Sequence, residues 1–180
     1  MREERARLLR WSAGVLAVAA FVGFLLAGAN RPHDPRLVPA GRTPISGFGE
    51  IAYRIDPGPA GGGVTAQRCA LLADTAEQQE LGLMHRTDLA GHDGMLFRFP
   101  SDTTTEFYMK DTLLPLSIAW FDSHGSFVSA TDMDPCPSQV QCPTFAAVAP
   151  YRYALEVLRG QLAGQGVGPG SHLVVGGACR

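Results

Sequence analysis

The side chains best placed for chemistry are those of Lys110, Asp111 and Thr112, which precede a strongly apolar segment. Lys110 and Asp111 are adjacent, so their side chains diverge and each needs a partner elsewhere, such as Arg86 for the carboxylate. These polar groups could hydrogen-bond a small ligand in a pocket with apolar walls. They could equally form a polar network that fixes the loop before the next strand. The candidate ligand-binding residues are Arg86, Tyr108, Met109, Lys110, Asp111 and Thr112.

Catalysis by paired carboxylates requires two acidic side chains that face one cleft at a defined separation. Asp93, Asp111, Asp122 and Glu156 are available, but nothing in their spacing requires such an arrangement. A serine nucleophile is less favoured, because no serine stands in a Gly-x-Ser-x-Gly turn. The sequence assigns no catalytic residue and leaves open whether the protein is an enzyme. A hydrolase that uses carboxylates near Asp93 and Asp111 is the alternative to a binding function.

Several thioether and imidazole side chains suggest a soft-metal site as an alternative, since both groups suit copper(I). Most of the methionines lie in apolar runs, where filling gaps in a core is the commoner use. No paired Cys/His spacing of a zinc site occurs, and no glycine-rich segment ends in the Lys-Ser/Thr of a phosphate-binding loop. We therefore expect no metal and no cofactor. The thioether and imidazole residues in question are Met84, His85, Met95, Met109 and Met133.

The four cysteines, Cys69, Cys136, Cys142 and Cys179, permit three disulfide connectivities. Cys136 and Cys142 flank a short loop, which favours a bond between them, and elimination then pairs Cys69 with Cys179. Free buried thiols are the alternative. The N-terminal segment disfavours free thiols, because it indicates export to an oxidising compartment.

An Arg-rich start and an uncharged apolar run from Trp11 to Ala29 predict a membrane-engaging segment with a cytoplasmic N-terminus. Ala27-Gly28-Ala29 suits a signal peptidase, whereas the run also approaches the about 20 residues that span a bilayer. Residues 1–29 are therefore a cleaved signal peptide, or an uncleaved anchor that contacts the membrane through residues 11–29. Both fates place the remainder outside the cytoplasmic membrane, either secreted or membrane-anchored.

Composition divides the rest of the chain into a linker, residues 30–63, and a globular domain, residues 64–180. The linker holds six Pro and seven Gly, although Ile51, Tyr53 and Ile55 alternate as in a short strand at 50–55. A chain of 180 residues that is 46% hydrophobic supports one ordinary core. Beyond residue 29 there are 11 basic and 15 acidic residues. This part of the chain is therefore net acidic, and it contains no basic stripe. For both reasons we expect no nucleic-acid partner.

The first elements of the globular domain are a strand, a helix and a second strand. Residues 65–73 predict the first strand, after which Asp74 can cap a helix that has Glu77 at the capping-box position. Residues 95–99 predict the second strand. Pro100 is expected to stop it, because proline and the polar residues after it are typical of turns.

A β-hairpin is the clearest element of the sequence. Pro115 fits the first position of a strand, in which Leu116, Ile118 and Trp120 share one face. Turn residues ending in Gly125 follow, and the apolar pattern then resumes. We therefore expect the hairpin to form the centre of the core.

Two further strands are expected at 153–158 and 172–175, separated by a Gly-rich connection at 161–170. Several short strands with one clear helix describe a β-rich α+β domain. Such a domain has few long strand edges that could remain unpaired. We therefore predict a small closed or nearly closed β-barrel-like domain with one short helix.

Three motifs in a fixed order resemble one known family, and together they extend from about Thr65 to Val175. The family is catalogued as domain of unknown function 192. The resemblance implies a compact, mostly β, barrel-like domain, often exported or membrane-tethered in bacteria and archaea, with no agreed substrate or cofactor. The family pattern has Trp, Asn and Asp where this chain has Tyr108, Asp111 and Ser117. The motifs are Gln79-x-x-Gly82-Leu83-Met84-x-Arg86-x-x-Leu89, Gly94-Met95-Leu96-Phe97-x-Phe99 and Phe107-Tyr108-Met109-Lys110-Asp111-Thr112-x-x-Pro115-Leu116.

The sequence thus predicts an extracytoplasmic, envelope-associated domain of unknown function. Non-enzymatic binding of a small molecule, a polysaccharide or an envelope protein is favoured over hydrolysis. The surface around Arg86 and Lys110-Asp111-Thr112 is the predicted place of binding.

Overall fold

The computed structural model describes residues 41–58, 65–136 and 141–179. The apolar run from Trp11 to Ala29 lies outside these residues, and no helix within them is long and apolar enough to cross a bilayer. Seven strands form one sheet in the order β6-β5-β8-β3-β2-β1-β9, and β4 pairs with β7 in a second, small sheet. The elements are β1 Gly49–Asp56, β2 Arg68–Ala73, α2 Ala76–Leu81, β3 Gly94–Thr103, β4 Phe107–Tyr108, β5 Leu116–Phe121, β6 Phe127–Met133, β7 Thr144–Phe145, β8 Tyr151–Leu158, α3 Gln161–Gly164 and β9 His172–Val175.

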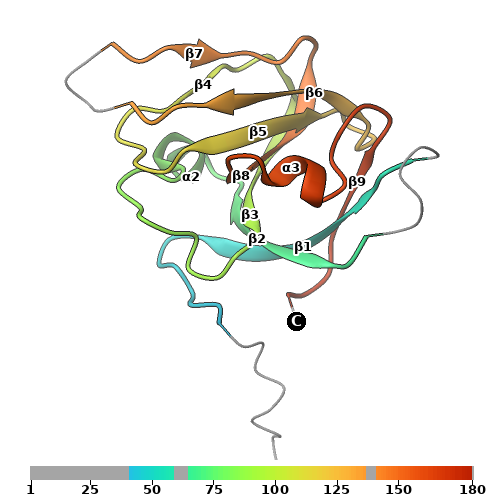
Figure 1. Ribbon diagram of the computed structural model, residues 1–180, viewed down its shortest axis with the longest axis horizontal. Helices are drawn as coiled ribbons and strands as arrows, with labels where there is room; N and C mark the ends of the chain where they lie inside the picture. Colours follow the sequence, from blue (N-terminus) through green and yellow to red (C-terminus); the bar gives the residue numbers. More distant parts are fainter. Residues whose placement is uncertain (1–40, 59–64, 137–140, 180) are drawn as a thin grey trace, which may run out of the picture. The chain divides into compact units, whose positions relative to one another are not determined.

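The seven-stranded sheet curls into a half-barrel (Figure 1). Its edge strands β6 and β9 meet at one corner, where Phe127 N–H donates to Ser171 O at 3.0 Å and Leu173 N–H donates to Gly125 O at 2.7 Å. The two edges do not pair along their lengths. The β-rich α+β class is therefore confirmed, while the barrel is half-formed rather than closed.

The predicted hairpin is confirmed as β5 and β6. Its turn is held by the Asp122 carboxylate, which accepts hydrogen bonds from the N–H groups of His124 and Ser126 at 2.8 Å each. Gly125 supplies the left-handed residue of this turn, with φ 86°. Side chains packed against both faces of the sheet bury all six residues of β5, which lies between β6 and β8. A strand buried on both faces explains the nearly unbroken apolar run.

Two hydrophobic clusters occupy the two faces of the sheet. Leu116, Ile118 and Trp120 of β5 belong to one cluster, as the alternation predicted. Ala119 and Phe121 belong to the other, which also contains residues of β1 and β9. The first face is covered by α2 and β4, and this layer contains the candidate site described below (Figure 1).

The strand expected around Ile51, Tyr53 and Ile55 is present as β1, longer than predicted at both ends. It pairs with β2 on one side and with β9 on the other, so it is an integral strand of the main sheet. The alternation of Ile51, Tyr53 and Ile55 was the informative signal, because all three are buried.

Three local expectations are wrong. The domain has two short helices instead of one, because residues 161–164 of the expected Gly-rich connection form α3. Pro100 does not end β3, which continues to Thr103, because the pairing of β3 with β8 shifts register between Arg98 and Thr103. A missing N–H is tolerated at such an irregularity. The N-cap of α2 is Thr75 rather than Asp74.

The capping box at the start of α2 accounts for this shift of one residue. Gln78 N–H donates to the Thr75 hydroxyl at 3.3 Å, and the Gln78 side chain accepts from the Thr75 N–H at 3.1 Å. Gln78 thus takes the role predicted for Glu77. Asp74 instead pairs with Arg98, at 2.6 Å between carboxylate and guanidinium.

Candidate functional site

The loop that carries Lys110, Asp111 and Thr112 is fixed by its own backbone. Asp111 adopts a left-handed conformation with φ 56°, which aspartate tolerates better than most residues. Its N–H donates to Cys136 O at 3.0 Å, and its carbonyl accepts from His85 N–H at 2.9 Å. These bonds join the turn after α2 to the disulfide loop. The backbone of this loop therefore has a structural task.

The six candidate ligand-binding residues separate into different surroundings. Met109 is only 1% exposed and belongs to the core. The guanidinium of Arg86 lies over the ring of Phe48, 5.6 Å from its centroid. Lys110 is exposed, and the structure forms no ion pair between it and another described residue. Two of the six, Tyr108 and Thr112, line a pocket.

This pocket, of about 450 Å³, lies between the α2 segment, β4 and one face of the main sheet. The hydroxyl of Tyr108 in β4 donates to Glu80 O in α2 at 3.4 Å, which joins the two sides. Apolar side chains form most of its wall. The lining residues are Ala76, Gln79, Glu80, Leu81, Gly82, Leu83, Met84, Phe97, Phe99, Thr105, Glu106, Phe107, Tyr108, Thr112 and Glu156.

Glu156 is the unusual member of this lining. It stands in the middle of β8, opposite Met95 of β3 and Ile118 of β5, and is 4% exposed. Its carboxyl group makes no hydrogen bond or ion pair with another described residue. Its oxygens are not among the fully enclosed polar atoms, so they keep some contact with the pocket. Burial raises the pKa of Glu156 from its ordinary value to about 8. A buried carboxyl group without a partner destabilises a fold, and such groups concentrate at functional sites.

The raised pKa makes stability depend on pH. Between about pH 5 and pH 8 the folded protein holds a proton on Glu156 that the unfolded chain, with its ordinary pKa of 4.5, has lost. The free energy of unfolding therefore falls as the pH rises, by up to about 1.4 kcal/mol per pH unit. We expect Glu156→Gln to abolish this fall, so that the variant is more stable than the parent at pH 8. Urea denaturation at pH 5, 6.5 and 8 measures the effect.

Glu77→Gln is the matched control, because Glu77 lies exposed on α2 and does not line the pocket. This control should keep the slope of the parent protein between pH 5 and pH 8. Equal slopes for the parent and Glu156→Gln would show that Glu156 ionises normally in the folded state.

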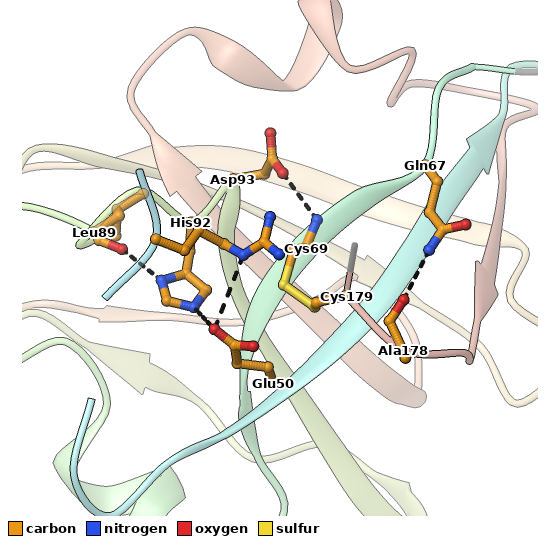
Figure 2. The surroundings of a disulfide bond; sticks show 9 residues. Glu50, Gln67, Cys69, Leu89, His92, Asp93, Ala178 and Cys179 are labelled. Atoms are coloured by element: carbon orange, nitrogen blue, oxygen red, sulfur yellow. Dashed lines mark hydrogen bonds and ion pairs between the residues drawn. A yellow bond between two sulfur atoms is a disulfide. The ribbon is translucent and has the colours of Figure 1, made fainter. Parts of the chain in front are cut away.

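A second, smaller hollow of about 220 Å³ lies beside the Cys69–Cys179 disulfide (Figure 2). Asp93 lines it, but both of its carboxylate oxygens are occupied. One accepts from Cys69 N–H at 2.8 Å and the other from Arg68 at 3.2 Å. Neither hollow is lined by both Asp93 and Asp111.

Figure 2 also shows a buried histidine next to this disulfide. The His92 ring bonds Leu89 O at 2.9 Å and the Glu50 carboxylate at 2.7 Å. Glu50, Cys69 and Cys179 are close enough together to suit a metal ion, but the disulfide removes both thiolates. This group is therefore a structural support at the joint of β1, β2 and the chain end.

Both predicted disulfides are present, Cys69–Cys179 and Cys136–Cys142. Two disulfides in one domain indicate an oxidising, extracytoplasmic environment. The methionines of the soft-metal alternative serve mainly as core residues, since Met95, Met109 and Met133 are almost completely buried.

The fold and the three motifs can now be compared with known proteins. Residues 61–175 match the profile of domain of unknown function 192 (DUF192), described as "Uncharacterized ACR". The chain belongs to the DUF192 family. No protein with a curated description matches it.

Two crystal structures share the fold of this DUF192 protein. One is a Sinorhizobium meliloti protein named as a candidate transcription regulator, with 28% identity and a TM-score of 0.60 over 74% of this chain and 98% of that one. The other is a protein of unknown function from Novosphingobium aromaticivorans, with 23% identity and a TM-score of 0.60 over 81% and 99% of the two chains.

Ser117 stands where the pattern of the family has Asp, and a carboxylate from another strand lies next to it. Ser117 is paired in register with Asp132 of β6, and its hydroxyl donates to the Asp132 carboxylate at 2.5 Å. The same hydroxyl accepts from Gly160 N–H at 2.9 Å. Because Ser117 does not line the pocket, these contacts stabilise the start of β5 and lie outside the candidate site.

Sequence reasoning named Glu156 among the available carboxylates without assigning it a role. The signal that marks it is its place in Tyr151–Leu158, a strand with apolar residues on both sides of the glutamate. Period-two alternation puts Glu156 on the same face as Ala154, which belongs to the buried core. A charged residue at a core position of a central strand is the pattern to search for.

Proposed function

We propose that this DUF192 protein is an extracytoplasmic binding module for a small molecule, which it holds in the pocket between α2, β4 and the main sheet. The observation that carries the proposal is the buried, unpartnered Glu156 in the wall of an otherwise mainly apolar pocket. A few polar groups placed in an apolar cavity are typical of small-molecule sites.

The size of the pocket favours a small molecule over a polysaccharide or an envelope protein. Its volume of about 450 Å³ lies within the range of about 300–1,000 Å³ for small-molecule sites. Aromatic side chains from β3 and β4 supply walls that a ligand can fill. A compact ligand is therefore the better match to this pocket.

The proposed location rests on the chain's cysteines and on its N-terminal segment. The two disulfides agree with export, and residues 1–29 have the charge and hydropathy pattern of a signal peptide or an anchor. We therefore propose that the domain acts at the cell envelope, either tethered to the membrane or secreted.

The transcriptional role in the name of the Sinorhizobium meliloti protein is not part of this proposal. Beyond residue 29 the chain has 15 acidic and 11 basic residues and no basic stripe, which disfavours binding to phosphate backbones. The carboxylate hydrolase is not favoured either, because Asp93 is occupied by Arg68 and Cys69.

Filling the pocket should weaken ligand binding without unfolding the domain. Ala76 is an exposed residue of α2 that lines the pocket, so Ala76→Phe places a ring in the cavity. We expect the neutral fluorophore N-phenyl-1-naphthylamine to bind the parent protein, with fluorescence enhancement, and to bind Ala76→Phe at least tenfold more weakly. A fluorescence titration measures both affinities.

Ala130→Phe is the matched control, since Ala130 is exposed on β6 and does not line the pocket. It should bind the fluorophore as the parent does, and both variants should keep the parent's melting temperature within a few degrees. Equal affinities for all three proteins, or no binding by the parent, would refute the proposal.

A further inference from the structure

The pocket-lining side chains that can become charged between pH 6 and pH 8.5 are all acidic. Three of the lining residues are glutamates, Glu80, Glu106 and Glu156, and none is lysine, arginine or histidine. Glu80 and Glu106 are exposed, whereas Glu156 is buried. The acidic groups therefore extend from the solvent-exposed part of the pocket to its interior. A cavity with one sign of charge and low-dielectric walls focuses its field and attracts ligands of the opposite sign.

The apolar walls suit a cation as well. Phe97 and Phe107 pack edge to face, with ring centroids 5.0 Å apart, and Phe99 and Tyr108 add further rings to the lining. Aromatic faces attract ammonium groups through their quadrupole, and more strongly where water is excluded. The same rings provide apolar area for the hydrocarbon part of a ligand.

We infer that the ligand is an amphipathic organic cation, an amine with an aromatic or aliphatic body, whose ammonium group meets the Glu156 carboxylate. This inference rests on the proposed function and specifies the ligand class for the same pocket. The ammonium supplies the hydrogen-bond donors that Glu156 lacks, in a charge-assisted pair. An anionic ligand would face three carboxyl groups and no basic side chain, so the pocket disfavours it.

Binding of such a cation has a consequence for protons. The pKa of Glu156 is about 8, so its carboxyl group is protonated in most free molecules at pH 7. An entering ammonium favours the carboxylate, and the proton leaves to solvent. The other titratable groups that face the pocket are Glu80 on α2, Glu106 before β4 and the Tyr108 phenol in β4. On the neighbouring strands, β3 and β5 place the non-titrating Met95 and Ile118 opposite Glu156. Affinity for the amine should therefore increase from pH 6 to pH 8.5.

Three probes of similar size test the charge preference, namely 2-phenylethylamine, 2-phenylethanol and 3-phenylpropionate. Displacement of N-phenyl-1-naphthylamine at pH 8.5 and low salt gives their affinities for the full domain. We expect the amine to bind at least tenfold more tightly than the alcohol, and the carboxylate to bind most weakly. Glu156→Gln should reduce the amine to the affinity of the alcohol and leave the alcohol within twofold.

Glu77→Gln, on the outer side of α2, is the control and should keep the full preference for the amine. If the parent binds the fluorophore but ranks the alcohol or the carboxylate equal to the amine, the inference is wrong and the proposed pocket stands. If the fluorophore does not bind to the parent protein, both the proposed pocket and the inference are wrong. The ranking by the parent protein decides the matter even if Glu156→Gln fails to fold.

Discussion

Loss of the Cys69–Cys179 disulfide is expected to lower the free energy of unfolding by about 4–5 kcal/mol. The two cysteines are 110 positions apart, so the bond closes a loop that contains most of the folded domain. Cross-linking so long a loop removes much of the conformational freedom of the unfolded chain. The bond also ties the segment after β9 to the start of β2, next to β1. Urea denaturation of Cys69→Ala/Cys179→Ala measures the loss.

Cys136→Ala/Cys142→Ala provides the comparison, because the sequence separation of this bond is only 6. The loop-entropy argument gives about 2 kcal/mol for so short a loop. The first double variant should therefore unfold at clearly lower denaturant concentration than the second. If the order is reversed, the short disulfide stabilises through its contacts with Asp111 and its neighbours, and the loop-entropy account fails.

The sequence was most informative where chemistry and periodicity are local. The hairpin of β5 and β6 follows from Pro115, the alternation of Leu116, Ile118 and Trp120, and a turn that ends in Gly125. The disulfides followed from the short loop between Cys136 and Cys142 and from elimination. These features need no knowledge of distant segments.

Predictions failed where a distant strand decides the outcome. Pro100 would end an isolated strand, but a register shift against β8 lets β3 continue past it. The N-cap of α2 is one residue later than expected. Asp74 pairs with Arg98 of β3, and Thr75 caps the helix. Local propensity could not distinguish these outcomes.

The candidate site was only partly predictable for the same reason. Tyr108 and Thr112 are polar or aromatic neighbours of Lys110 in the sequence, and both line the pocket. Glu156 is separated from them by more than forty positions, and pairing of β8 with β5 is what brings it to the same face of the sheet. Its pocket is formed by α2, β3, β4 and β8 together, a combination that no single motif contains.

Trp120→Ala is expected to destabilise the domain by about 3–5 kcal/mol, as the truncation of a large buried side chain. Trp120 is 1% exposed in the central strand β5, and its ring lies 6.2 Å from Phe107 and 6.3 Å from Tyr151 between ring centroids. Removing it leaves a cavity behind the pocket-lining ring of Phe107. Chemical denaturation followed by circular dichroism measures the loss, and Val148→Ala, at a position 81% exposed, should change stability by less than about 0.5 kcal/mol.

Trp120→Phe separates packing from hydrogen bonding at this position. The indole N–H of Trp120 is buried and has no hydrogen-bond partner among the described residues. Leaving a polar group in this state costs about 1–3 kcal/mol, which phenylalanine avoids while it retains most of the aromatic contact. Trp120→Phe should therefore lose far less stability than Trp120→Ala. Equal losses would mean that the indole N–H has a partner in solution, and a loss near zero for Trp120→Ala would contradict the central position of β5 in the core.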